Sequence, residues 1–318
     1  MMTLIGVELR RNFARRMYRV TMLLVSGVML TASIIVFFNH SKDAPAVNVN
    51  RGPDREELVQ MCAQGEGSFG PFHGPDADRL PPPGSIERRM MCERFIPPTI
   101  GGEYVALDDD RFSYAGLPGI LLGITPTLVI LSWVLASSFI GAEWRANTIG
   151  PLLTWEPRRI RLLLAKLFAS MIVVIATALA AHVLLSLLLY PSAVFRGTTQ
   201  GMDGAFWREV GGVVFRSTLL ATLASVIGFA VGSIGRNTTA AVGIGFGYLA
   251  VLEGGILGGL LPWIRPWLLV GNAIVLASGE RDFAIAGRTP IQAGVVLTCY
   301  AAAIAAVATT LFRRRDVA

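Results

Sequence analysis

The sequence predicts an all-α integral membrane protein with six transmembrane helices, an amphipathic N-terminal helix at the membrane interface, both termini in the cytoplasm, and a large extracytoplasmic loop between the first two spans. Two observations support this prediction. The 318 residues are 53% hydrophobic and only 16% charged, whereas soluble domains carry about 25% charged residues. The apolar residues also gather in runs of about 20 or more, the length that a helix needs to cross a bilayer, and helices are the spanning structure for such runs.

The order of apolar and polar runs divides the chain into four parts. Residues 1–18 should form the interfacial helix and residues 19–38 the first span. Residues 39–118 should form an extracytoplasmic loop subdomain. Residues 119–318 should hold the other five spans, with a short cytoplasmic helix at 143–161 and an outer re-entrant or surface segment at 262–290.

Residues 3–18 carry an apolar side chain at every fourth position: Ile5, Leu9, Phe13 and Met17. Glu8 and four arginines lie among the remaining positions, so the segment should lie as a helix in the headgroup plane. The alternative is the basic lead of a signal peptide, for which residues 44–46 give a loose cleavage-site match. The interfacial helix is favoured because the basic segment is long and the apolar run after it is long enough to cross a bilayer. Five arginines before the first span predict a cytoplasmic N-terminus.

The 39–118 segment is acidic in an otherwise basic chain, with 13 acidic and 8 basic residues against a whole-chain net charge of +6. This asymmetry agrees with a loop outside the cytoplasm, where disulfides persist, so a bridge between Cys62 and Cys92 is expected. Short helices are expected near residues 54–62 and 85–95. His73 lies between the two cysteines, but two cysteines and one histidine leave a zinc site short of ligands, and we expect no metal there.

The remaining spans follow from the apolar runs. They are expected at residues 119–140 (with a kink at Pro126), 162–190, 210–232, 240–261 and 291–312. The run at 240–261 is rich in glycines spaced four apart, which permits close contact between helices: Gly243/Gly247, Gly254/Gly258 and Gly255/Gly259.

His182, Arg216 and Glu253 are ionisable residues inside the expected spans. Such residues at membrane depth are candidate functional sites. Glu253 could face a wet interior and pair with Arg216. The alternatives are a purely structural ion pair or a position near the outer interface, and His182 is better explained as a hydrogen-bonded interior residue than as a proton carrier.

Residues 143–166 form the only substantial polar island between the long apolar runs of the C-terminal two-thirds. Basic residues outnumber acidic ones there, which predicts a cytoplasmic position. Glycine and proline interrupt the segment, and Ile149, Leu152 and Leu153 form an apolar middle. This composition is typical of a short amphipathic helix that docks onto another structure, whereas an ordinary positive-inside loop has no need of a proline-bounded apolar middle.

The same island resembles the region between the second and third spans in permeases of the type-2 ABC transporter family. In that family an acidic residue, a small residue with threonine, a leucine pair, a Pro-Arg-Arg step and a lysine follow in this order. Here they are Glu143, Asn147-Thr148, Leu152-Leu153, Pro157-Arg158-Arg159 and Lys166. Asn147 departs from the more frequent glycine. Residues 312–317 resemble the usual family ending, and the 39–118 segment is longer than usual.

The resemblance implies the transmembrane subunit of a bacterial ABC exporter, a multi-pass protein of the cell membrane that exports a hydrophobic compound, a lipid or a peptide. It would pair with a second copy or a homologous permease and with two copies of a separate ATPase, which would bind ATP and Mg²⁺. The residues that would couple to the ATPase are Glu143, Trp144, Arg145, Thr148, Leu152, Leu153, Glu156, Pro157, Arg158 and Arg159.

The chain itself shows no catalytic pattern. Its only lysines, Lys42 and Lys166, do not belong to a phosphate-binding loop, and its three histidines do not cluster. We therefore expect no enzymatic activity, bound cofactor, metal or nucleic acid. The alternative function is a non-transporting membrane scaffold or sensor whose extracytoplasmic loop binds a partner. A membrane enzyme is disfavoured because no His, Asp or Ser cluster lies at the span ends.

Overall fold

The computed structural model describes residues 2–40, 46–51, 55–64, 81–95, 103–108, 111–253, 262–281 and 284–314. The chain divides into two compact units. Unit 1 consists of Met1–His40 and Phe112–Ala318, and unit 2 consists of Ser41–Arg111.

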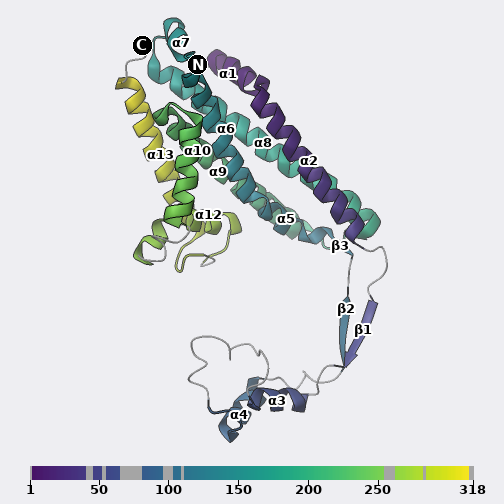
Figure 1. The fold of residues 1–318 in the computed structure, drawn as a ribbon. Coiled ribbons are helices and arrows are strands. Elements are labelled where there is room, and N and C mark those ends of the chain that lie inside the picture. Colours follow the sequence, from purple (N-terminus) through teal and green to yellow (C-terminus); the bar gives the residue numbers. More distant parts are fainter. Residues whose placement is uncertain are drawn as a thin grey trace. The chain divides into compact units, whose positions relative to one another are not determined.

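Unit 1 is a bundle of helices (Figure 1). Among the described residues, five helical segments are long and apolar enough to cross a membrane. They are α2 (Arg16–Asn39), the segment Tyr114–Arg145, α8 (Arg159–Arg196), α9 (Gly204–Gly235) and α13 (Pro290–Arg314). The prediction of a helical, multi-pass membrane protein is therefore confirmed.

The segment Tyr114–Arg145 consists of η3 (Tyr114–Gly116), α5 (Leu117–Gly123) and α6 (Thr125–Arg145). The helix is interrupted at Ile124, and Pro126 stands in the first turn of α6. Proline suits this position because its missing N–H would have no helical partner there. The kink expected at Pro126 is thus a short break between two helices.

The helix after the polar island is longer than expected. It was expected at residues 162–190, but α8 has 38 residues and continues through Pro191. It leads into β4 (Gly197–Thr198), which pairs in parallel with β3 (Phe112–Ser113). Any side chain at Gly197 would collide with the Phe112 carbonyl oxygen, so glycine is required at this crossing.

The fifth expected span, residues 240–261, is described only as far as Glu253. It begins as α10 (Thr238–Tyr248) and continues as the π-helical turn η4 (Leu249–Glu253). After residues outside the described part, η5 (Pro262–Trp267) leads into α12 (Leu269–Ser278). With ten residues α12 is too short to span a bilayer, as expected for the 262–290 segment.

Helices α6 and α9 pack closely against each other in unit 1. A Cβ added to Gly228 of α9 would lie 2.6 Å from the Trp133 carbonyl oxygen, and one added to Gly232 would lie 3.0 Å from that of Ser137. Small residues here let the backbones approach. In the described part of the chain, no close helix contact is made at Gly243 or Gly247, because a Cβ there meets no described atom within 4 Å. The pairs at 254–259 lie outside the described residues.

Unit 2 contains the antiparallel strands β1 (Ala46–Arg51) and β2 (Glu103–Asp108) and the helices α3 (Arg55–Gln64) and α4 (Ile86–Phe95). Cys62 of α3 and Cys92 of α4 form a disulfide, with their Cα atoms 6.0 Å apart. Both cysteines are buried against Val59. The expected bridge is confirmed, whereas His73 lies outside the described residues.

Candidate functional site

The turn between α6 and α8 holds a separate short helix, α7 (Ile149–Trp155). The chain reverses at Asn147, which has a φ of 51°. Glycine adopts this left-handed region freely, and asparagine is among the few other residues that tolerate it. This conformation accounts for asparagine at a position where the resemblance predicts glycine.

The backbone of Glu143 closes this turn. Its carbonyl oxygen accepts hydrogen bonds from the Thr148 amide at 3.1 Å and from the Thr148 hydroxyl at 3.3 Å. Thr148 immediately precedes α7. The start of α7 is therefore fixed to the end of α6 through one carbonyl group.

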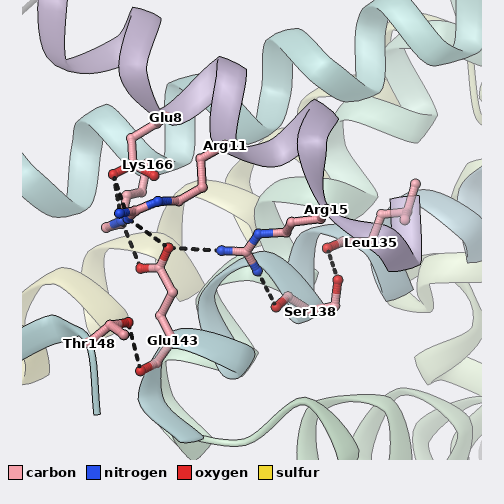
Figure 2. Close-up of polar contacts among 8 residues, drawn as sticks. All are labelled: Glu8, Arg11, Arg15, Leu135, Ser138, Glu143, Thr148 and Lys166. Atoms are coloured by element: carbon pink, nitrogen blue, oxygen red, sulfur yellow. Dashed lines mark hydrogen bonds and ion pairs between the residues drawn. The ribbon is translucent and has the colours of Figure 1, made fainter. Parts of the chain in front are cut away.

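The side chain of Glu143 belongs to a buried ionic cluster, which Figure 2 shows. Lys166 Nζ of α8 lies 2.7 Å from Glu143 Oε2 and 2.7 Å from Glu8 Oε1 of α1 (Met2–Ala14). These three side chains are only 5–6% exposed. Charges buried to this extent require partners, and here each carboxylate has one at close range.

Two arginines complete the cluster. Arg15 Nη2 donates to Glu143 Oε1 at 2.8 Å, and Arg15 Nη1 donates to the Ser138 carbonyl oxygen at 3.2 Å. Arg11 Nη1 lies 3.6 Å from both carboxylates. Burial lowers the pKa of the Arg15 guanidinium, while the charges of Glu143 and Glu8 oppose that shift.

The cluster changes the interpretation of the N-terminal helix. Its buried side chains are the polar residues Glu8 and Asn12, while Phe13 and Met17 of the apolar stripe are 41% and 43% exposed. The polar residues Glu8 and Asn12 thus face the helical bundle, together with Leu9 of the stripe, which packs against Leu135, Phe139 and Val173. Its location in the headgroup plane stays a prediction, and the outward position of Phe13 and Met17 is compatible with it.

One end of α7 is buried against the helical bundle, and the other end is exposed. Ile149 is buried in a cluster with Ile140, Leu163 and Phe312, and Leu153 packs against that cluster. Trp155 at the other end of α7 is 89% exposed. Large exposed aromatics are enriched where one protein binds another, so α7 combines a fixed base with an exposed apolar tip.

The structure separates the expected coupling residues into two groups. Trp144 packs edge-on against Phe312 and under the Arg236 guanidinium, while Arg145 Nη2 donates to Asn237 Oδ1 at 3.2 Å. With Glu143 they bind other helices of this chain. A second group lies around α7 and is wholly or partly exposed: Thr148, Leu152, Leu153, Glu156, Pro157, Arg158 and Arg159.

Sequence reasoning left Trp155, Glu8, Arg11 and Arg15 out of the candidate site. Glu8 was detectable as the one acidic residue in a strongly basic helix. Its partner Lys166 is 158 residues away in sequence, and nothing in the local pattern identifies that pairing.

His182, Arg216 and Glu253 do not form one site. Arg216 donates to the carbonyl oxygens of Ala277 and Ser278, at the C-terminal end of α12. Glu253 Oε1 accepts from the Val270 amide in the first turn of α12 at 2.9 Å. No ion pair between Arg216 and Glu253 occurs in the described structure.

Arg216 and Glu253 bind opposite ends of α12 instead of each other. A short helix has unpaired N–H groups at its start and unpaired carbonyls at its end, and its dipole favours an anion at the first and a cation at the second. Glu253 and Arg216 meet these two needs separately. His182 Nδ1 lies 2.7 Å from the Ala178 carbonyl oxygen of its own helix, consistent with the expected interior residue.

No group of His, Cys, Asp or Glu suited to a metal ion occurs in the part of the chain that the structure describes. Comparison of the sequence with protein-family models and with curated proteins gave no match.

Proposed function

We propose that this chain is the transmembrane permease subunit of a type-2 ABC exporter and moves a hydrophobic compound, lipid or peptide out of the cell. It acts in the cell membrane with a second copy or a homologous permease and with two copies of a separate ATPase. ATP and Mg²⁺ bind to that partner, and this chain has no catalytic role of its own.

The observation that supports this proposal best is the build of α7. A seven-residue helix with a buried base and an exposed tryptophan is suited to docking on another protein. The start of α1, the end of α13 and α7 lie at the same end of unit 1 (Figure 1). That end carries Arg10, Arg11, Arg16, Arg158 and Arg314, and arginine-rich segments favour the cytoplasm, where the ATPase would be found.

The contacts of Glu143 supply a path for coupling. Its carbonyl holds the start of α7, and its carboxylate binds Arg15 and Lys166. A displacement of α7 would therefore act on α6, on the N-terminal helices and on α8 together. Binding of the ATPase shifts the permease between states only if α7 contacts it differently in each state.

The first test removes the exposed tip of α7. We expect Trp155→Ala to abolish co-purification of an ABC ATPase with the full chain from native membranes, because tryptophans are frequent binding hot spots. Trp207→Ala is the matched control, since Trp207 is also exposed but lies in the first turn of α9. Equal ATPase recovery with both variants would contradict the docking role of α7.

A second test reverses charge beside α7. The variant with Arg158→Glu and Arg159→Glu should fold and insert normally but lose substrate-stimulated ATP hydrolysis and efflux. The two introduced carboxylates would repel the ATPase surface that the arginines bind. Unchanged stimulation and efflux would count against the proposal.

The disulfide of unit 2 favours one other function, a scaffold or sensor that binds an extracytoplasmic partner. Chemical cross-linking in native membranes separates the two functions. Cross-links from Ser41–Arg111 to another protein, with no ATPase recovered at α7, would support the scaffold.

A further inference from the structure

A cavity of about 450 Å³ lies among α6, α9, α10, α12 and α13 of unit 1. Small-molecule sites in proteins have volumes of about 300–1,000 Å³, so this one could hold a ligand of moderate size. It is separate from the ionic cluster and from α7, since no residue of either contributes to its wall.

The wall is apolar almost throughout. Of its 21 residues, only Trp133, Tyr248 and Tyr300 have a polar side-chain atom. None of these 21 described residues has a charged side chain. A ligand with charged or strongly polar groups would lose its water here and gain no partner, which is costly.

The three polar atoms are already bonded within the protein. Trp133 Nε1 donates to the Ala241 carbonyl oxygen at 3.3 Å, and the Tyr300 hydroxyl donates to that of Trp267 at 3.0 Å. The Tyr248 hydroxyl donates to Glu253 Oε1 at 2.8 Å and accepts from the Leu269 amide at 3.2 Å. These bonds leave a surface of carbon atoms for any ligand.

Gly245 keeps α10 close to Trp133 at this wall. A Cβ on Gly245 would lie 2.8–2.9 Å from three atoms of the indole ring. The glycine therefore allows α10 to pack against the indole ring while Trp133 Nε1 donates to the backbone of the same helix. The position of the indole, and with it one side of the cavity, is fixed by packing.

We infer that this cavity binds one hydrocarbon chain, the acyl tail of a membrane lipid. Three of its walls, α6, α9 and α13, belong to helical segments long and apolar enough to span the bilayer, so acyl chains surround the protein at this depth. Apolar cavities of smaller volume in other proteins are known to bind hydrocarbons and exclude water. The inference is independent of export and of any ATPase.

The test uses the full chain in nanodiscs of phosphatidylcholine, a small fraction of which carries a diazirine in one acyl chain. The labelled positions are mapped by mass spectrometry after illumination. Two faces of α13 provide an internal comparison: Leu297 and Tyr300 line the cavity, whereas Ile291 and Val295 are exposed at 79% and 57%.

Wild-type protein should be labelled on both faces. Ala273→Phe adds a ring inside the cavity, because Ala273 lines it, and should lower labelling at Leu297 and Tyr300 about tenfold, equivalent to about 1.4 kcal/mol of binding. Labelling at Ile291 and Val295 should stay the same. Ala302→Phe, which adds equal volume at an exposed position of α13 outside the cavity, should change neither face.

Three results would overturn the inference: no labelling at Leu297 and Tyr300 in the wild type, the same labelling there with Ala273→Phe, or equal loss with Ala302→Phe. A parallel sample contains diazirine-bearing palmitic acid in place of the labelled lipid. Inner-face labelling by the free acid alone would rule out a lipid tail as the occupant. If Ala273→Phe is not monodisperse, Ala224→Leu on the α9 wall replaces it with the same expectations.

Discussion

Lys166 offers the most direct test of the buried cluster. Its ammonium lies 2.7 Å from a carboxylate of α1 and 2.7 Å from one of α6. Lys166→Met keeps most of the side-chain volume and removes the charge. Glu8 and Glu143 would then remain buried together, with only Arg11 and Arg15 to neutralise them.

The expected loss of stability follows from the two contacts. At 2.7 Å and an effective dielectric constant of about 20, each attraction amounts to about 6 kcal/mol. The cost of dehydrating three charges offsets most of this sum. Removal of one partner from a buried ion pair costs about 3–5 kcal/mol, and the two remaining arginines place the value for Lys166→Met near the lower end, at about 3 kcal/mol.

Thermal unfolding of the purified protein, followed by tryptophan fluorescence, measures this loss. A cost of about 3 kcal/mol should lower Tm by about 6–12 °C if the scaling for domains of 150–250 residues applies. Tryptic cleavage within α1 should also accelerate, because α1 loses its main attachment to α8. Arg10→Met, at an exposed position of α1, should change stability by no more than about 0.5 kcal/mol.

A double variant checks the cause. Glu8→Gln with Lys166→Met removes both partners of one pair and should recover part of the stability that Lys166→Met loses. A Tm for Lys166→Met that matches the Arg10→Met control would refute the reasoning, because the cluster would then contribute nothing to the attachment of α1.

Three further predictions concern other parts of the fold. Gly228→Ala should cost about 1–3 kcal/mol of stability by overpacking the α6–α9 contact. Gly211→Ala in the same helix should not destabilise the protein, because its Cβ meets no described atom within 4 Å. Equal Tm values for the two variants would contradict the close approach of α6 and α9. Reduction of the Cys62–Cys92 bridge should cost unit 2 about 3–4 kcal/mol of stability by the loop-closure model and should speed proteolysis of Ser41–Arg111. The unreduced, unfolded chain should react with maleimide only at Cys299. Three labelled thiols would refute the bridge. Arg216→Met should cost about 1.5–3 kcal/mol, the typical value of hydrogen bonds to a charged group, and should speed hydrogen exchange in α12; unchanged exchange there would show that Arg216 does not hold its C-terminal end.

The sequence predicts those features that depend on neighbouring residues. Apolar runs locate the five long helical segments, with ends that differ from the expected ones by at most six residues. The length of residues 268–277 marks α12 as too short to span. The disulfide follows from there being two cysteines in a loop that should face outside. Each of these inferences uses a property of one continuous segment.

The features that sequence reasoning missed depend on contacts between distant segments. Glycine spacing pointed to Gly243 and Gly247, yet Gly228 and Gly232 make the tight contact, because the choice depends on which face of α9 meets α6. Burial of Glu8 was hidden for the same reason: amphipathicity shows that a helix has two faces, but it does not show that the polar one meets buried charges on α6 and α8.

The two sets of charged contacts in unit 1 have different mechanical consequences. Glu253 and Arg216 each bind one end of α12, so either contact can change while the other persists. Glu143 instead holds the start of α7 through its backbone and binds α1 and α8 through its side chain. The turn before α7 cannot shift relative to α6 without straining bonds to the same residue. A force applied at Trp155 would thus reach three helices through one position, which is what a coupling element requires and what an unattached surface loop would lack.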